Sequence, residues 1–212
     1  MPRTLIAAIA LLLAAPGFAS AATLTTDRQC YVDVKGQQIG VTGTGWAPGS
    51  AWGVIGGSIT KSGTVDAAGG FAFQTALPTI FGDGIKPQKV RLSGTQDGAE
   101  IASTSFKVVE FLVAPKDISG KPSGKTSWGF SGFRPGKAIY IHVRRGGKTY
   151  TDKVGKGDKV CGTLRTRLRR LPAVPPSKIR FGRYKLYVDN RPKFSKGGLQ
   201  FPATIRIRRV PA

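Results

Sequence analysis

Side chains that could catalyse a reaction are scarce in this sequence of 212 residues. They are one histidine, two cysteines and, in the second half, four carboxylates: His142, Cys30, Cys161, Asp117, Asp152, Asp158 and Asp189. Acid–base catalysis needs such groups within hydrogen-bonding reach of each other, and zinc sites need their ligands at short, regular spacings. No pair or cluster in the sequence has that spacing. We therefore predict a protein that is not an enzyme and that has no cofactor and no metal site.

Basic side chains are abundant instead, and nearly all of them lie in the second half. The whole chain has a formal net charge of +22. Residues 22–115 contain 7 Lys and Arg against 7 Asp and Glu, whereas residues 116–212 contain 25 against 4. Exposed Lys and Arg keep a β-sheet soluble and protect its edges, which explains some of these residues. Solubility does not explain why one half is neutral and the other strongly basic, so we predict that the second half binds polyanions.

The first 21 residues have the pattern of a secretory signal. A basic start at Arg3 precedes an apolar run over residues 5–15, and an Ala-Ser-Ala sequence ends at Ala21. A transmembrane anchor is the alternative, but a membrane span needs about 20 apolar residues and this run is shorter. We expect a signal peptide over residues 1–21 and a secreted protein with no transmembrane segment in the mature chain, with its charge able to retain it at the cell surface.

The two cysteines, Cys30 and Cys161, would meet an oxidising environment in an exported protein. One cysteine lies in each half, so a disulfide between them would join the halves covalently. Closing a separation of roughly 130 residues could stabilise the chain by up to about 4–5 kcal/mol in the entropic account. Two free or buried thiols are the alternative. We predict the disulfide.

The two halves share one sequence plan. "GTGWAPGSAWGV" (residues 43–54) aligns with "FSGFRPGKAIYI" (residues 130–141). The alignment matches a glycine, an aromatic residue, a proline and a second glycine in each copy: Gly45, Trp46, Pro48 and Gly49 with Gly132, Phe133, Pro135 and Gly136. Pro followed by Gly predicts a type II turn, because Pro fixes a negative φ and Gly accepts a positive one. We expect this segment to turn the chain between two strands.

This repeated pattern resembles the immunoglobulin-like repeats of bacterial secreted and surface proteins. The resemblance implies an all-β protein with two tandem immunoglobulin-like β-sandwich domains, a neutral one over residues 22–115 and a basic one over residues 116–212. It implies no particular function, because this sandwich supports many unrelated roles.

Alternation in a strand assigns each side chain of the second half to a face. In "GTLRTRLRRLP" (residues 162–172) it places Leu164 and Leu168 in the core. It places Arg165, Arg167 and Arg169 in solvent, where we predict a secondary basic face.

Immunoglobulin-like topology would put the strands near residues 139–144, 183–188 and 205–208 in one sheet and the strand near 163–169 in the opposite sheet. The outward positions of the first three strands combine positive charge with two tyrosine rings. We predict a polyanion-binding surface of Tyr140, His142, Arg144, Arg183, Lys185, Tyr187, Arg206 and Arg208. The tyrosines could stack on nucleic-acid bases, although tyrosine is also an ordinary strand residue.

Two functions remain open at this point. In the first, the protein is a non-enzymatic module whose basic half binds an anionic extracellular polymer or surface, such as a phosphate-rich wall polymer, an acidic polysaccharide, an anionic surface or DNA, and it takes no small-molecule substrate. In the second, it is an adhesin or assembly module that binds a protein or a neutral glycan, and its charge is incidental. Only the first predicts affinity that falls steeply with salt.

Overall fold

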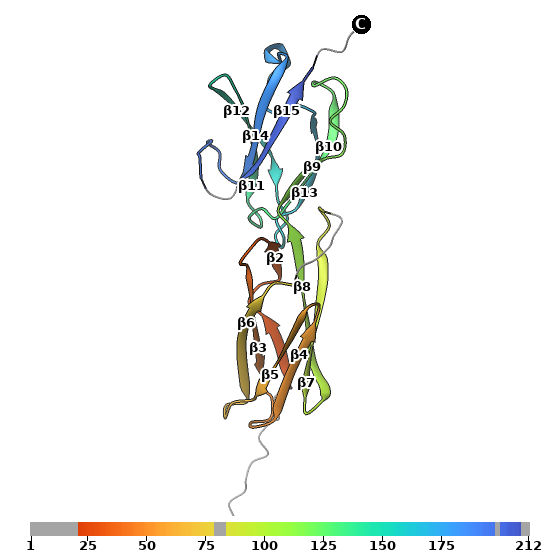
Figure 1. The fold of residues 1–212 in the computed structure, drawn as a ribbon, viewed down its shortest axis with the longest axis vertical. Helices are drawn as coiled ribbons and strands as arrows, with labels where there is room; N and C mark the ends of the chain where they lie inside the picture. Colours follow the sequence, from red (N-terminus) through yellow and green to blue (C-terminus); the bar gives the residue numbers. More distant parts are fainter. Residues whose placement is uncertain (1–20, 79–83, 198–199, 209–212) are drawn as a thin grey trace, which may run out of the picture.

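The structure is a computed structural model that describes residues 21–78, 84–197 and 200–208. All but the last residue of the expected signal peptide lie outside these ranges. The described chain is built of β-strands with one short 3₁₀ turn, η1 (Pro176–Lys178). Two groups of strands follow each other along an elongated molecule, and β15 (Phe201–Ile207) runs toward the far end of the second group (Figure 1).

The first group forms two sheets. An antiparallel sheet has the order β1-β3-β6, with β1 (Thr23–Thr26), β3 (Gln38–Thr44) and β6 (Gly70–Ala76). The second sheet has the order β2-β8-β7-β4-β5, with β2 (Cys30–Asp33), β4 (Ala51–Gly56), β5 (Ile59–Thr64), β7 (Gln88–Gln96) and β8 (Ala99–Glu110). β2 pairs with β8 in parallel. The core between these sheets includes Trp46, Trp52 and Leu92, so the first half is a β-sandwich.

The second group also forms two sheets. One has the order β13-β10-β9, with β9 (Leu112–Pro115), β10 (Lys125–Ser131) and β13 (Leu164–Arg169). The other has the order β12-β11-β14-β15, with β11 (Ala138–Arg145), β12 (Lys148–Lys156), β14 (Gly182–Asp189) and β15 (Phe201–Ile207). The predicted distribution of strands is confirmed, because β11, β14 and β15 are neighbours and β13 lies in the opposite sheet.

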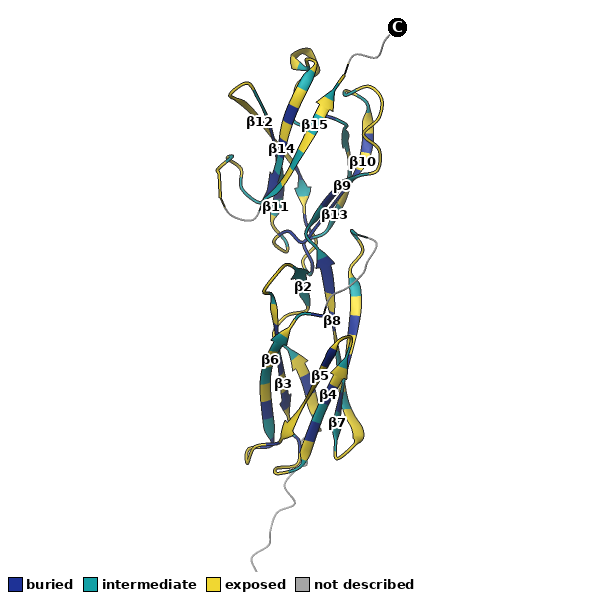
Figure 2. Cartoon of the chain, viewed as in Figure 1, coloured by how far each residue is buried: buried dark blue, intermediate teal, exposed yellow. Residues whose placement is uncertain are grey.

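Alternation of apolar residues explains the second core. Ile139, Ile141 and Val143 on β11 are fully buried, as are Tyr184 and Val188 on β14. Figure 2 colours the buried parts of the strands dark blue.

A buried tyrosine also ties the start of β14 to the loop before it. The hydroxyl of Tyr184 donates to the carbonyl oxygen of Arg180 (2.8 Å) and accepts from the amide of the same residue (2.8 Å). Such a link from a strand to backbone a few residues upstream is typical of immunoglobulin-like sandwiches.

The predicted type II turns are present in both halves. Gly49 has a φ of +75° and Gly136 a φ of +66°. The amide of Ser50 donates to the carbonyl of Ala47 (3.2 Å), and the amide of Lys137 donates to the carbonyl of Arg134 (3.2 Å). Pro and Gly therefore have the local role that the sequence predicted.

Strand pairing divides the chain slightly earlier than expected. Leu112–Pro115, placed by the sequence at the end of the first half, is β9 and pairs with β10. Val113 belongs to the second core. The two sandwiches therefore meet at Phe111, between β8 and β9, and not after residue 115, because the apolar side chains of β9 complete the second core.

The predicted disulfide between Cys30 and Cys161 is confirmed, with their Cα atoms 5.3 Å apart. Cys30 begins β2, and Cys161 lies in the loop between β12 and β13. The bond therefore joins the first sandwich to the second close to their junction.

Candidate functional site

The outer face of the four-stranded sheet brings most of the predicted binding residues together. We call this surface, formed by the outward side chains of β11, β14 and β15, the basic face. Strand register pairs Arg144 with Lys185 across β11 and β14. It pairs Arg183 with Arg206 across β14 and β15. Two pairs of like charge therefore stand directly opposite each other on one face.

The predicted residues differ in how accessible they are. Arg183, Lys185, Arg206 and Arg208 are exposed, and Arg208 follows the last residue of β15. Tyr140, Arg144 and Tyr187 are only partly exposed. A ligand approaching the basic face would therefore meet cations first and the tyrosine rings at its margin.

The prediction that His142 is an exposed surface residue is wrong. Its side chain is fully buried although it has the outward strand position. Its Nδ1 lies 2.9 Å from the hydroxyl of Thr151, and its Nε2 lies 3.2 Å from a carboxylate oxygen of Asp189. His142 therefore cannot contact a ligand on the basic face.

The segment between β14 and β15 causes this burial by folding back over the sheet. We call its described residues, 190–197 and 200, the strap. The Phe194 ring lies 5.7 Å from the His142 ring and 5.0 Å from the Tyr187 ring, between centroids. The guanidinium carbon of Arg144 lies 4.7 Å from the centroid of the same phenyl ring. Phe194 therefore packs against the Tyr187 ring and reduces the part of it that a ligand could stack on.

Asp189 holds the strap in place, a role that the sequence did not reveal. This aspartate ends β14 and is buried. It accepts hydrogen bonds from the Arg191 amide (2.7 Å), from the Arg191 guanidinium (2.9 and 3.0 Å) and from the Gln200 amide group (3.1 Å). Burial alone would raise the pKa of Asp189, but these hydrogen bonds and that from His142 outweigh it and lower the pKa. The sequence offered one signal of this role. Asp189 is an isolated acidic residue at the end of an expected strand, in a half of the chain that contains 25 Lys and Arg.

The secondary basic face lies on β13, in the opposite sheet. Arg165 and Arg167 are exposed, as predicted from alternation. Arg169 is only partly exposed and pairs across strands with Lys125 of β10. These side chains add to the field of the second half from its other side and do not extend the basic face.

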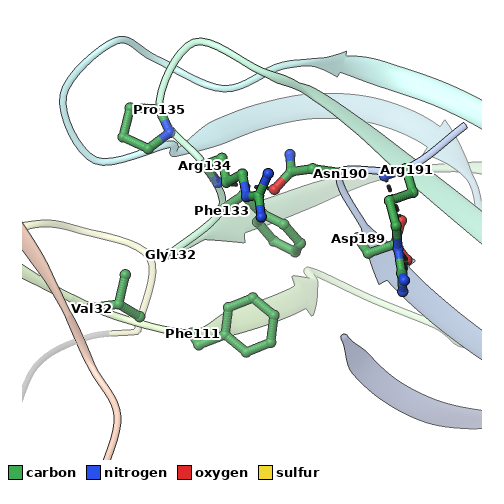
Figure 3. Close-up of a pocket in the computed structure, with 9 residues that line it drawn as sticks. All are labelled: Val32, Phe111, Gly132, Phe133, Arg134, Pro135, Asp189, Asn190 and Arg191. Carbon is green, nitrogen blue, oxygen red and sulfur yellow. Dashed lines mark hydrogen bonds and ion pairs between the residues drawn. The ribbon is translucent and has the colours of Figure 1, made fainter. Parts of the chain in front are cut away.

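A cavity of about 360 Å³ lies where the two sandwiches meet. Its walls combine two phenyl rings with polar groups at the end of β14: Val32, Phe111, Gly132, Phe133, Arg134, Pro135, Asp189, Asn190 and Arg191 (Figure 3). The Asn190 side-chain oxygen accepts from the Arg134 amide (3.0 Å). The polar wall of the cavity therefore includes Asp189 and Arg191, which also hold the strap in place. These residues connect the junction of the two sandwiches to the basic face.

Other kinds of site were sought in the described ranges. Over residues 21–78, 84–197 and 200–208, no three His, Cys, Asp or Glu side chains gather closely enough to hold a metal ion. In the same part of the chain, no helix has the length and apolar character to cross a membrane.

Comparison with known proteins gives no family assignment. No protein-family model and no curated protein matches this sequence. Among solved structures, a Ca²⁺-stabilized adhesin with which an Antarctic bacterium binds ice matches 88% of this chain with 14% identity and a TM-score of 0.34, and the match covers 47% of the adhesin chain. This chain therefore spans less than half of that structure.

Two further structures match at a similar level. The human OSCAR ligand-binding domain matches 88% of this chain and 97% of its own, with 11% identity and a TM-score of 0.35. A red sea bream transglutaminase matches 90% of this chain and 32% of its own, with 13% identity and a TM-score of 0.31. Since all these TM-scores are below 0.5, the β-sandwich assignment depends on the strand pairing of this chain itself.

Proposed function

We propose that this protein is a non-enzymatic, extracellular binding module built of two tandem immunoglobulin-like domains. Its basic second domain docks on an anionic polymer through the basic face, and the neutral first domain acts as a spacer or a partner surface. The polymer class includes phosphate-rich wall polymers, acidic polysaccharides and DNA.

The paired like charges on the basic face are the observation that supports this proposal most. Arg183 lies opposite Arg206, and Arg144 lies opposite Lys185. Like charges directly opposite each other on a sheet destabilise it. A polymer with a regular row of anionic groups would remove this repulsion and release its own counterions on binding.

Three of the four acidic residues of the second half are already engaged elsewhere. Asp117 forms an ion pair with Arg170 (3.0 Å), and Asp189 is buried beneath the strap. Asp158 accepts hydrogen bonds from backbone amides of its own loop. Among the described residues, no ion pair joins a carboxylate to Arg183, Lys185 or Arg206. The first half differs, because its Arg91 is paired with Glu100 at 2.6 Å.

A salt-graded binding experiment with charge-reversed variants tests the proposal. The full mature chain would be titrated into fluorescently labelled polyphosphate, heparin and duplex DNA at several salt concentrations. Affinity for at least one of them should fall by orders of magnitude between about 50 and 200 mM salt. A triple variant, Arg183→Glu, Lys185→Glu and Arg206→Glu, should lose most of the remaining affinity.

The matched control reverses three exposed lysines of the first half: Lys61→Glu, Lys89→Glu and Lys107→Glu. It makes the same change in net charge at a distance from the basic face, so its affinity should fall much less. Equal losses in the two triple variants would show that net charge alone matters and would refute the basic face as the docking site. Binding that is unchanged by salt and by both variants would instead support an adhesin that recognises a protein or a neutral glycan.

A further inference from the structure

β15 ends at the end of the second sandwich that is farther from the first (Figure 1). A groove of about 790 Å³ lies there. Four segments form it: the β9–β10 loop, the chain after β13, the segment after η1 and the end of β15. The lining residues used below are Ile118, Arg170, Leu171, Arg180, Phe181 and Ile207. This volume lies within the range of ordinary small-molecule sites.

The floor of the groove is apolar and continues into the core. Leu171 is buried in the second core, and Ile179 and Ile207 pack against that core. At the opening, Ile118 is 59% exposed and Phe181 is 55% exposed. Large apolar side chains left accessible around a concave surface are a mark of a ligand or partner site. A sugar-phosphate or nucleic-acid backbone would not use such a floor.

The rim of the groove is cationic. Lys121, Arg180, Arg206 and Arg208 line it and are exposed. Asp117, on the loop between β9 and β10, already forms an ion pair with Arg170. A ligand that fits both floor and rim must combine an apolar part with an anionic part.

Arg170 lies beneath the cationic rim and is ion-paired with Asp117. It lines the groove, and its Nε is buried without a hydrogen-bond acceptor among the described residues. A buried donor without an acceptor is rare in native proteins. A phosphate at the rim would instead accept from the exposed guanidinium groups of Arg180, Arg206 and Arg208, since arginine is well suited to phosphate because of its planar, multiple donors.

We propose that the groove binds a lipid phosphate with a single alkyl chain, with the chain over Ile118 and Phe181 and the phosphate among the arginines of the rim. The proposal does not rest on polymer docking, although the rim shares Arg206 and Arg208 with the predicted polyanion-binding surface.

Calorimetric titration of the full mature chain with dodecyl phosphate, below its micelle concentration, tests the inference. Dodecyl maltoside supplies the same tail with a neutral head, and ethyl phosphate supplies the head almost without a tail. Dodecyl phosphate should bind at least about tenfold more tightly than either control, because only it uses both floor and rim. Equal affinity for dodecyl maltoside, or no heat from dodecyl phosphate, would overturn the inference.

Variants locate the binding and separate it from polymer docking. Phe181→Ser and, independently, the exposed-loop variant Ile118→Ser should each weaken dodecyl phosphate binding by about tenfold. Both should leave the affinity for polyphosphate unchanged. The pair Arg183→Glu and Lys185→Glu should do the reverse, so that failure of one site is distinguishable from failure of the other.

Competing occupants give different results. If a second copy of the chain fills the groove, the protein will self-associate and Phe181→Ser will make it monomeric without any effect of lipid. If residues 209–212 fill it, a chain that ends at Arg208 will bind dodecyl phosphate and the intact chain will not. Either result would overturn the proposed lipid site.

Discussion

Asp158 is a single carboxylate that holds together the loop carrying Cys161. One of its oxygens accepts from the amides of Val160 and Cys161, both at 2.8 Å. The other accepts from the amide (2.6 Å) and the hydroxyl of Thr163. Partial burial would raise the pKa of Asp158, but these hydrogen bonds outweigh it and lower the pKa to about 2.

Replacing this carboxylate should therefore destabilise the protein in a pH-dependent way. Asp158→Asn keeps the shape but turns one acceptor into a donor facing Thr163, so the free energy of unfolding should fall by roughly 1–2 kcal/mol at pH 7. The ionised form is favoured in the folded chain, so the contribution of Asp158 is complete above about pH 4 and is lost as pH falls to about 2. Urea unfolding at pH 7, 4 and 2 should show the two proteins converging.

The control for this prediction is Asp152→Asn, which changes an exposed aspartate on β12. It should leave the unfolding free energy almost unchanged at every pH, because surface substitutions away from special contacts have small effects. A difference between wild type and Asp158→Asn that persists at pH 2 would show that the lost stability has another origin.

At the scale of the element, the strap decides which parts of the basic face a ligand can reach. Strand alternation predicted the directions of the β11, β14 and β15 side chains because it depends only on local geometry. The strap has no alternation or repeat to mark it, and its contacts join residues from separate strands. Burial of His142 follows from those tertiary contacts, which is why the sequence pointed to an exposed residue.

Removing the Phe194 ring should loosen the strap and expose His142. Phe194→Ala loses two ring contacts and a cation–π contact with Arg144, each worth about 0.5–1.5 kcal/mol. The chain has one histidine, so its reaction with diethyl pyrocarbonate reports on that residue alone. We expect the reaction to be at least about tenfold faster in the variant, since about 1.4 kcal/mol of lost local stability corresponds to tenfold.

Lys193→Ala is the matched control, because it shortens an exposed side chain of the same strap. Its histidine should react as slowly as that of the wild type. Equal acceleration in both variants would mean that any change that loosens the strap exposes His142. The phenyl ring would then have no particular part in protecting it. Wild-type protein whose histidine reacts at once would contradict the burial itself.

At the scale of the molecule, two sandwiches of similar architecture differ in charge and are linked covalently. Residue counts predicted the charge difference, and the cysteine positions predicted the link. The exact junction was not predictable, because the apolar pattern of β9 does not show which of the two cores its side chains enter. The disulfide fixes how the basic second half is held relative to the neutral first half.

Breaking this disulfide should cost stability and orientation while leaving both sandwiches folded. Cys30→Ser with Cys161→Ser removes a link between residues 131 positions apart, so the free energy of unfolding should fall by up to about 4–5 kcal/mol. Each sandwich keeps its own core, so strand content measured by circular dichroism should stay the same. Small-angle scattering should show a broader range of end-to-end distances, because only the chain near Phe111 and the packing at the junction would then hold the two halves.

Wild-type protein denatured without reductant should contain no reactive thiol. Two thiols per chain in that assay would show that the bond does not form.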